Sequence, residues 1–156
     1  MTLPRVAVII SNYNYGDFVI DAIDSALSQD YEGEIRVYVL DDGSSDGSWD
    51  KISSYAAEDI SSITDKHEVN EPYYKGSMES FKCSDLGLWC YRIENSGAST
   101  ARNVAMWEAW SWADYFAILD ADDMYHPSKV RKHVDALLKY EEVGVSYSDY
   151  IVHKTH

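Results

Sequence analysis

Residues 115–127 read YFAILDADDMYHP, an apolar run that is followed at once by three carboxylates, those of Asp120, Asp122 and Asp123. A short apolar run that ends in turn-forming residues is typical of a buried strand. Carboxylates spaced this closely raise one another's pKa and repel each other unless a cation lies among them. The stretch therefore predicts a strand that leads into either a solvated acidic loop or a loop that holds a cation.

The same order of strand, polar turn and helix recurs along the chain. Apolar and β-branched runs predict strands at residues 5–10, 34–40, 88–93, 115–119 and 143–147. Helical spacing of apolar residues predicts helices at residues 17–29, about 45–55, 98–112 and 127–140. Residues 57–87 keep no sustained period, and we interpret them as an irregular excursion or insertion. The alternation predicts a single α/β domain over residues 1–156, with a mainly parallel sheet flanked by helices.

Composition limits the possible classes of protein. The chain has 156 residues, of which 46% are hydrophobic, so it can form one domain with a core. Its formal net charge is -14 without any basic cluster, which makes nucleic acid and anionic membranes poor partners. No stretch is apolar for long enough to span a bilayer. We interpret Cys83 and Cys90 as free thiols and expect a cytoplasmic chain, with peripheral membrane contact through regions beyond residue 156 left open.

Polar clusters follow four of the predicted strands, at residues 11–14, 41–46, 95–97 and 120–123. Ligands of open α/β sheets bind outside the carboxyl ends of the strands, so these clusters are expected to share one rim. Each cluster alone also fits an ordinary turn. Asp120 and Asp122, however, project to the same side of an extended chain about 6.8 Å apart, so both can reach one ion or its waters. A hard divalent ion bound by one or two carboxylates takes substrate phosphates as its other ligands.

Four blocks in this order make the sequence recognisable: VAVIISNYN at residues 6–14, VLDDGSSDGS at 39–48, ENSGASTARN at 94–103 and AILDADDMYHP at 117–127. Together they resemble the family 2 glycosyltransferases, which have the GT-A (nucleotide-diphospho-sugar transferase) fold. The resemblance implies metal-assisted transfer, with inversion, of a sugar from a nucleotide-diphosphate sugar. A UDP-sugar is weakly favoured as donor, and the acceptor is an unknown glycan, lipid or protein, as in polysaccharide biosynthesis.

The resemblance also implies roles for individual residues. The implied contacts to the nucleotide sugar are Ser11, Tyr13, Asp41, Asp42, Gly97, Arg102 and Asp120. Ser11 and Tyr13 would lie against the base, although Ser11 stands where a proline is more usual. Asp120-Ala121-Asp122 matches the Asp-x-Asp motif, in which Asp122 would ligate Mn2+ or Mg2+, with Asp120 at the ribose or the ion's water shell. A plain salt bridge is the alternative for Arg102.

Inverting transfer needs a general base that deprotonates the acceptor hydroxyl. In the family this carboxylate lies well downstream of the Asp-x-Asp motif, so we expect it beyond His156 and interpret the chain as a truncated donor-binding part of the fold. The alternative is a non-catalytic nucleotide-sugar-binding module or an inactive fragment. A dinucleotide-binding oxidoreductase is excluded because residues 11–16 lack the glycine-rich turn that such a site needs.

Overall fold

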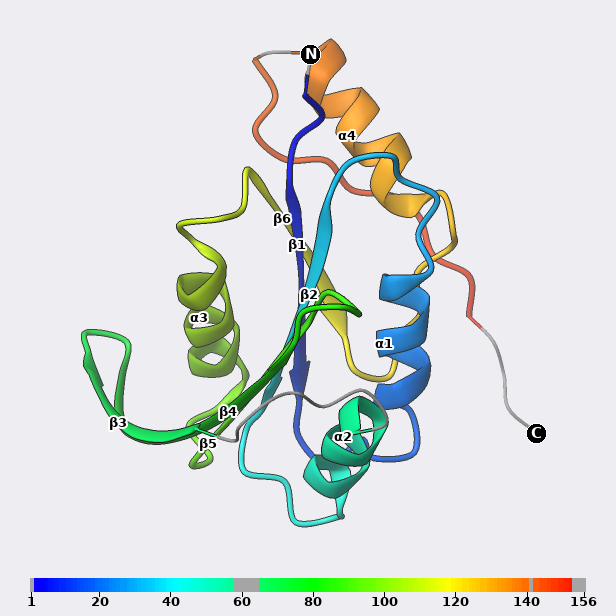
Figure 1. Ribbon diagram of the computed structural model, residues 1–156. Coiled ribbons are helices and arrows are strands. Elements are labelled where there is room, and N and C mark those ends of the chain that lie inside the picture. The colour runs from blue at the N-terminus through cyan, green and yellow to red at the C-terminus, as the bar shows by residue number, and fades with distance from the viewer. Residues whose placement is uncertain (1, 58–64, 141, 153–156) are drawn as a thin grey trace.

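The computed structural model describes residues 2–57, 65–140 and 142–152, and these form one sheet with helices on both faces (Figure 1). The strands are β1 (Val6–Asn12), β2 (Ile35–Asp41), β3 (Asp65–Glu71), β4 (Tyr74–Cys83), β5 (Leu88–Ile93) and β6 (Tyr115–Asp120). The helices are α1 (Val19–Leu27), α2 (Ser48–Ala57), α3 (Ala98–Ala109) and α4 (Lys129–Lys139). The strand order is β3-β4-β5-β2-β1-β6, which confirms the predicted α/β class with a mainly parallel sheet.

The centre of the sheet is parallel. β1 pairs in parallel with β2 on one side and β6 on the other, and β2 pairs in parallel with β5. In this register Asn12 lies opposite Asp41, and Ser11 lies opposite Asp120. The carboxyl ends of these strands therefore meet at one edge of the sheet, as the polar clusters predicted.

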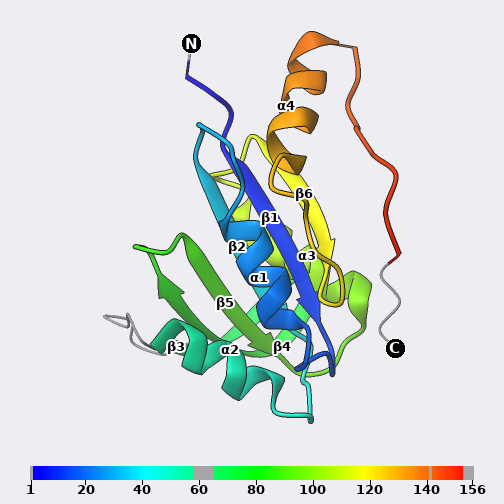
Figure 2. The same ribbon diagram turned by 90° about the vertical axis from the view of Figure 1, so that its right-hand side faces the viewer.

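The two faces of the sheet have separate cores. Alternate residues of a strand point to opposite faces, so Val8 packs with α1, α2 and α4, whereas Ile9 packs with α3. Figure 1 shows α3 alone on one face, and Figure 2 looks onto the face that carries α1 and α2. Because β1 is covered on both faces, its side chains from Val6 to Ile10 are almost completely buried, and its sequence is a continuous apolar run without alternation.

The prediction of an irregular excursion at residues 57–87 is wrong for the part that the structure describes. β4 pairs antiparallel with β5, and β3 pairs antiparallel with β4. β3 is an edge strand with the polar sequence DKHEVNE and is mostly exposed, so it lacks the apolar alternation that reveals a strand. Residues 58–64 lie outside the described residues. That 57–87 is an insertion relative to other family members stays a prediction.

The predicted strand at residues 143–147 is also wrong. This stretch has no regular structure, and it is tied to α4 instead of to a neighbouring strand. Ser146 Oγ lies 2.7 Å from His133 Nδ1, and Lys129 Nζ donates to Ser148 Oγ at 2.8 Å. A strand needs a partner for its backbone groups, and the apolar pattern of a segment does not supply one.

Two further sequence predictions concern the thiols and the membrane. Cys83 and Cys90 are both buried free thiols, as predicted. Burial raises the pKa of the Cys90 thiol well above its usual value. None of the helices in the described ranges has the length and the apolar character that crossing a membrane requires.

Two glycines of the β2–α2 loop are required for different reasons, one for its backbone conformation alone and the other also for close packing. Gly43 and Gly47 both have positive φ, but an added Cβ at Gly43 would lie 2.8 Å from the backbone nitrogen of Asn95, whereas at Gly47 it would meet nothing within 4 Å. We expect Gly47→Ala to lower the free energy of unfolding by about 1 kcal/mol and Gly43→Ala to lower it by about 1–3 kcal/mol more. Urea denaturation followed by circular dichroism measures both losses. Equal losses would contradict a close approach between this loop and the end of β5.

Candidate functional site

A cavity of about 290 Å³ opens at the edge where the parallel strands end. Its lining comes from the ends of β1, β2 and β6 and from the first turns of α3. The lining residues are Ser11, Asn12, Tyr13, Tyr15, Asp42, Ala98, Ala101, Arg102, Asp120, Ala121 and Asp122. The structure thus brings together six of the predicted site residues: Ser11, Tyr13, Asp42, Arg102, Asp120 and Asp122. Of the predicted residues, Asp41 and Gly97 do not line this cavity.

Asp42 is held at the start of α3. Its side chain is buried, and its two carboxylate oxygens accept hydrogen bonds from the backbone N–H groups of Ser96 at 2.7 Å and Gly97 at 2.8 Å. A negative charge in this position is stabilised by the amide groups and by the helix dipole. Gly97 has a positive φ of 88°, and an added Cβ would meet nothing within 4 Å. The backbone conformation, rather than crowding by protein atoms, is therefore what requires glycine there.

Asp41 lies beneath the cavity instead of in its wall. Its fully buried carboxylate accepts hydrogen bonds from Asn12 Nδ2 at 2.9 Å and from the backbone N–H of Ser44 at 3.0 Å, and it lies 3.5 Å from Arg92 Nε. Because a carboxylate only accepts hydrogen bonds, it fixes the amide group of Asn12 with its nitrogen towards Asp41. Asp41 thus positions a residue that lines the cavity, and its direct contact with a nucleotide stays a prediction.

Arg102 and Asp120 form an ion pair in the wall of the cavity. One terminal nitrogen of Arg102, on α3, donates to Asp120 Oδ1 at the end of β6 at 2.5 Å. The two side chains are 36% and 52% exposed, so the pair is accessible from the cavity. The Nε atom of Arg102 is buried and has no hydrogen-bond partner among the residues that the structure describes. The salt bridge considered as an alternative for Arg102 is therefore present, and it lies within the candidate site.

The acidic loop after β6 leaves its carboxylates exposed. Asp120, Asp122 and Asp123 are all exposed, and the first two line the cavity. Partial burial raises the pKa of Asp123, and the negative charges of Asp122 and Asp120 raise it further. The loop is closed by a hydrogen bond from the backbone N–H of Asp123 to the carbonyl of Asp120 at 3.1 Å.

The carboxylates of this loop fit a divalent ion that takes some of its ligands from the protein and the others from a substrate. No three His, Cys, Asp or Glu side chains come together as a metal-binding group within residues 2–57, 65–140 and 142–152. Two carboxylates that line one cavity are nevertheless enough for Mg2+ or Mn2+ when phosphate oxygens and water supply the other positions. The pair Asp120 and Asp122 meets that requirement.

Five lining residues were missed from the sequence: Asn12, Tyr15, Ala98, Ala101 and Ala121. Tyr15 follows Tyr13 in the same polar turn and is likewise about half exposed, so its aromatic side chain was a usable signal. Asn12 is buried, and its Oδ1 atom has no hydrogen-bond partner in the described part of the chain. The three alanines carry no chemistry, and their small side chains leave room for a ligand.

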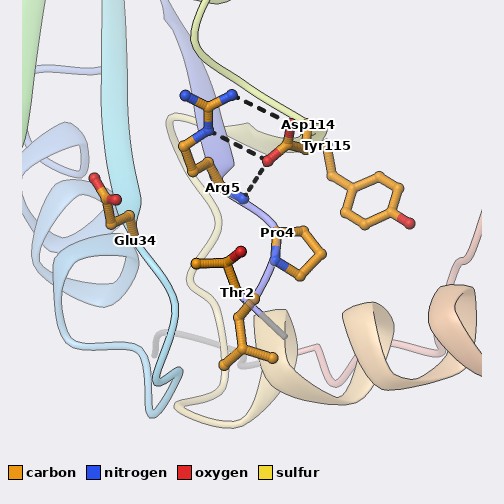
Figure 3. A pocket seen from close by; sticks show the side chains of 7 residues that line it. Thr2, Pro4, Arg5, Glu34, Asp114 and Tyr115 are labelled. Atoms are coloured by element: carbon orange, nitrogen blue, oxygen red, sulfur yellow. Dashed lines mark hydrogen bonds and ion pairs between the residues drawn. The ribbon is translucent and has the colours of Figure 1, made fainter.

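A larger cavity of about 570 Å³ lies at the opposite, amino end of the strands (Figure 3). The one basic residue of its described lining is already engaged, because Arg5 and Asp114 point at one another. The backbone nitrogen of Arg5 donates to Asp114 at 2.8 Å, and two of its guanidinium nitrogens donate at 3.3 Å. None of the predicted site residues lines it. The smaller cavity is the better candidate because six of the predicted site residues line it.

Solved structures share this fold. The structure matches TarS of S. aureus, solved in complex with UDP-GlcNAc, with a TM-score of 0.63 and 20% identity. The match covers 88% of this chain and 32% of the TarS chain. It also matches the mannosyltransferase PcManGT from Pyrobaculum calidifontis, solved with GDP-Man and Mn2+, over 80% of this chain and 29% of that one, with a TM-score of 0.58 and 24% identity. The predicted GT-A fold of glycosyltransferases is therefore confirmed.

The sequence comparison identifies the family. The family model described as "Glycosyl transferase family 2" matches residues 7–154, so the chain belongs to this family, as the four blocks predicted. A named relative is the Escherichia coli UDP-Glc:alpha-D-GlcNAc-diphosphoundecaprenol beta-1,3-glucosyltransferase WfaP, which is 30% identical over 96% of this chain and 47% of its own length. Another is TuaG of Bacillus subtilis, a putative teichuronic acid biosynthesis glycosyltransferase, 28% identical over 87% of this chain and 43% of its length. The chain thus spans less than half the length of these curated relatives.

The crowding of the acidic loop can be tested by titration. Asp122→Asn removes one of the two charges that raise the pKa of Asp123, so we expect this pKa to fall towards its usual value. Carboxyl ¹³C NMR as a function of pH measures the shift. Asp85→Asn removes the same charge from an exposed position between β4 and β5 and should leave the pKa of Asp123 unchanged. The packing of the loop would be contradicted if Asp123 titrated identically in all three proteins.

Proposed function

We propose that the chain binds a nucleotide-diphosphate sugar in the 290 Å³ cavity, as the donor side of an inverting glycosyltransferase. The observation that carries this proposal is the convergence of an aromatic pair, an arginine and two exposed carboxylates on one cavity at the carboxyl edge of a parallel sheet. A nucleotide sugar offers an aromatic base, hydroxyl groups and a diphosphate, which are the groups that such a lining can hold.

The base is expected at the end of the cavity formed by the turn after β1. Tyr13 and Tyr15 are 48% and 43% exposed, so each ring has a free surface on which a base can stack. Ser11 and Asp42 line the same end and can hydrogen-bond with the base or the ribose. The donor of the E. coli relative is UDP-Glc by its name, and TarS was solved with UDP-GlcNAc, which supports a UDP-sugar. Because the mannosyltransferase was solved with GDP-Man, a GDP-sugar is the second candidate.

The diphosphate is expected between the start of α3 and the acidic loop. The amino end of a helix favours an anion, and Ala98 and Ala101 leave the α3 backbone open to the cavity. Arg102 is the basic residue of the lining and can donate to a phosphate oxygen. Asp122, with Asp120 beside it, would hold Mn2+ or Mg2+. When bound, such an ion offsets the negative charge that the diphosphate gains as it leaves the sugar.

In the proposed reaction an acceptor hydroxyl oxygen bonds to the anomeric carbon while the bond from that carbon to the diphosphate breaks. The acceptor proton passes to a general base, which we expect beyond His156. The acceptor is a glycan, lipid or protein, and the names of the relatives favour a polysaccharide precursor. The carboxylates of the described lining are already engaged on the donor side: Asp42 by α3, Asp120 by Arg102, and Asp122 by the proposed ion. This keeps a nucleotide-sugar-binding module as the second candidate for this stretch of chain.

The cellular location belongs to the same proposal. Two buried free thiols are typical of a reducing compartment, so we propose that the chain works on the cytoplasmic side. Peripheral contact with a membrane would then depend on other regions of the protein.

Calorimetry with UDP, in the presence and absence of Mn2+, tests the role of Asp122. We expect Asp122→Asn to weaken UDP binding by about tenfold or more with Mn2+ present and to leave the weak metal-free binding unchanged, because only the ion depends on this carboxylate. Asp85→Asn removes an equal charge from an exposed turn away from the lining and should bind like the wild type. If the UDP affinity changes neither when Mn2+ is added nor when Asp122 is substituted, the proposed metal ligand is refuted.

Release of nucleotide diphosphate separates an enzyme from a binding module. The chain is incubated with UDP-sugars and GDP-sugars, with and without Mn2+, with water as the acceptor of the sugar, and the released UDP or GDP is quantified. An enzyme should release the diphosphate at a rate that falls in Asp122→Asn and does not change in Asp85→Asn. Tight binding with no release above the rate in buffer favours the module.

A further inference from the structure

We propose that Arg102 makes the binding of a divalent ion depend on the nucleotide, because its guanidinium occupies Asp120 until a diphosphate offers it better acceptors. This inference rests on the proposed function and adds to it a residue that couples two ligands. It concerns what Arg102 does before the donor arrives, when its partner is a carboxylate of the Asp-x-Asp motif.

The ion pair uses only part of the hydrogen-bonding capacity of Arg102. Arginine and a carboxylate can form two parallel hydrogen bonds, yet here a single terminal nitrogen of Arg102 reaches Oδ1 of Asp120, at 2.5 Å. The buried Nε–H of Arg102 has no partner in the described residues. An unsatisfied buried donor is unfavourable, so the guanidinium gains if it moves to a ligand that accepts two hydrogen bonds. A phosphate group is such a ligand.

The charges around the pair also disfavour the binding of an ion before the nucleotide. Arg102 is the one basic residue in the described lining of the cavity, whereas Asp120 and Asp122 line it and Asp123 follows in the same loop. Arg92 is engaged elsewhere, because it donates to the Ser44 carbonyl and lies 3.5 Å from Asp41. While Arg102 stays on Asp120, an incoming dication meets a positive charge and finds one of its two carboxylates already occupied.

A diphosphate reverses this situation. It brings negative charge for both Arg102 and the ion, so the guanidinium can leave Asp120 without losing its partner, and Asp120 can then face the ion or its waters. The ion and the nucleotide should therefore strengthen each other's binding by the same factor, as linkage requires. Part of that factor is the release of Asp120 by Arg102, which is a positioning role and not a catalytic one.

The test measures Mn2+ binding by electron paramagnetic resonance, in which unbound Mn2+ gives the signal, with and without saturating UDP. We expect the wild type to bind Mn2+ about tenfold or more tightly when UDP is present. In Arg102→Gln, Mn2+ alone should bind about threefold or more tightly than in the wild type, because Asp120 is freed, while the gain from UDP should shrink. Arg102→Met carries the same expectation without a hydrogen-bonding group, and Arg102→Lys, which keeps the charge, should retain the weak binding of Mn2+ alone.

Arg131→Gln is the matched control. It removes the same charge from an exposed pair with Asp30, at 3.3 Å, and Arg131 does not line the cavity. Its Mn2+ binding should equal that of the wild type in both conditions. Tighter Mn2+ binding by the Arg102 variants is a gain that damage to the fold would not produce. Thermal melts followed by circular dichroism establish that each variant is folded.

The outcomes separate this inference from the proposed function. If wild type binds Mn2+ and UDP cooperatively but the neutral variants of Arg102 bind Mn2+ alone no more tightly than it does, the coupling role of Arg102 is refuted and the donor site stands. If the wild type binds UDP no better with Mn2+ than without it, both the inference and the metal-assisted donor site are refuted.

Discussion

The parallel alignment of β1 with β2 and β6 is the interaction on which the rest of the molecule depends. It places Asn12 beside Asp41 and Ser11 beside Asp120, so side chains that are far apart in sequence become neighbours at one edge. Burial of β1 on both faces stabilises this alignment, and a shift of the register by one residue would exchange the side chains that face the two cores, which differ in their packing partners. The cavity is a consequence of where these strands end.

Negative charge at that edge is accommodated in three ways. Asp41 is buried among hydrogen-bond donors with Arg92 nearby, Asp42 is held by two backbone amides before α3, and Asp120 is paired with Arg102. Asp122 is exposed and belongs to the same wall. A chain with a net charge of -14 can thus bind an anionic ligand only where local positive groups reverse the sign of the field.

Much of this architecture could be predicted from the sequence, and the exceptions have physical causes. The continuous apolar run of β1 and the polar blocks after the strands revealed a parallel sheet with its site at one rim. β3 escaped prediction because an exposed edge strand needs no apolar alternation, and residues 143–147 were mistaken for a strand because their pattern does not show whether a partner is available. Asp41 and Asp42 are identical in type, and only the register of β2 decides that the first is buried below the cavity while the second lines it.

The position of β6 at the end of the strand order gives the two walls of the cavity different resistance to local opening. β2 is hydrogen-bonded to a strand on each side, and loops after β1 and β2 are joined by the hydrogen bonds of Asn12, Asn14 and Ser44. β6, in contrast, is bonded to β1 alone within the described sheet. Amide protons on the acidic side of the cavity should therefore exchange with solvent faster than those on the base side. In the proposed donor site, the wall expected to face the base is therefore the fixed one, and the wall expected to face the diphosphate is the one that can yield.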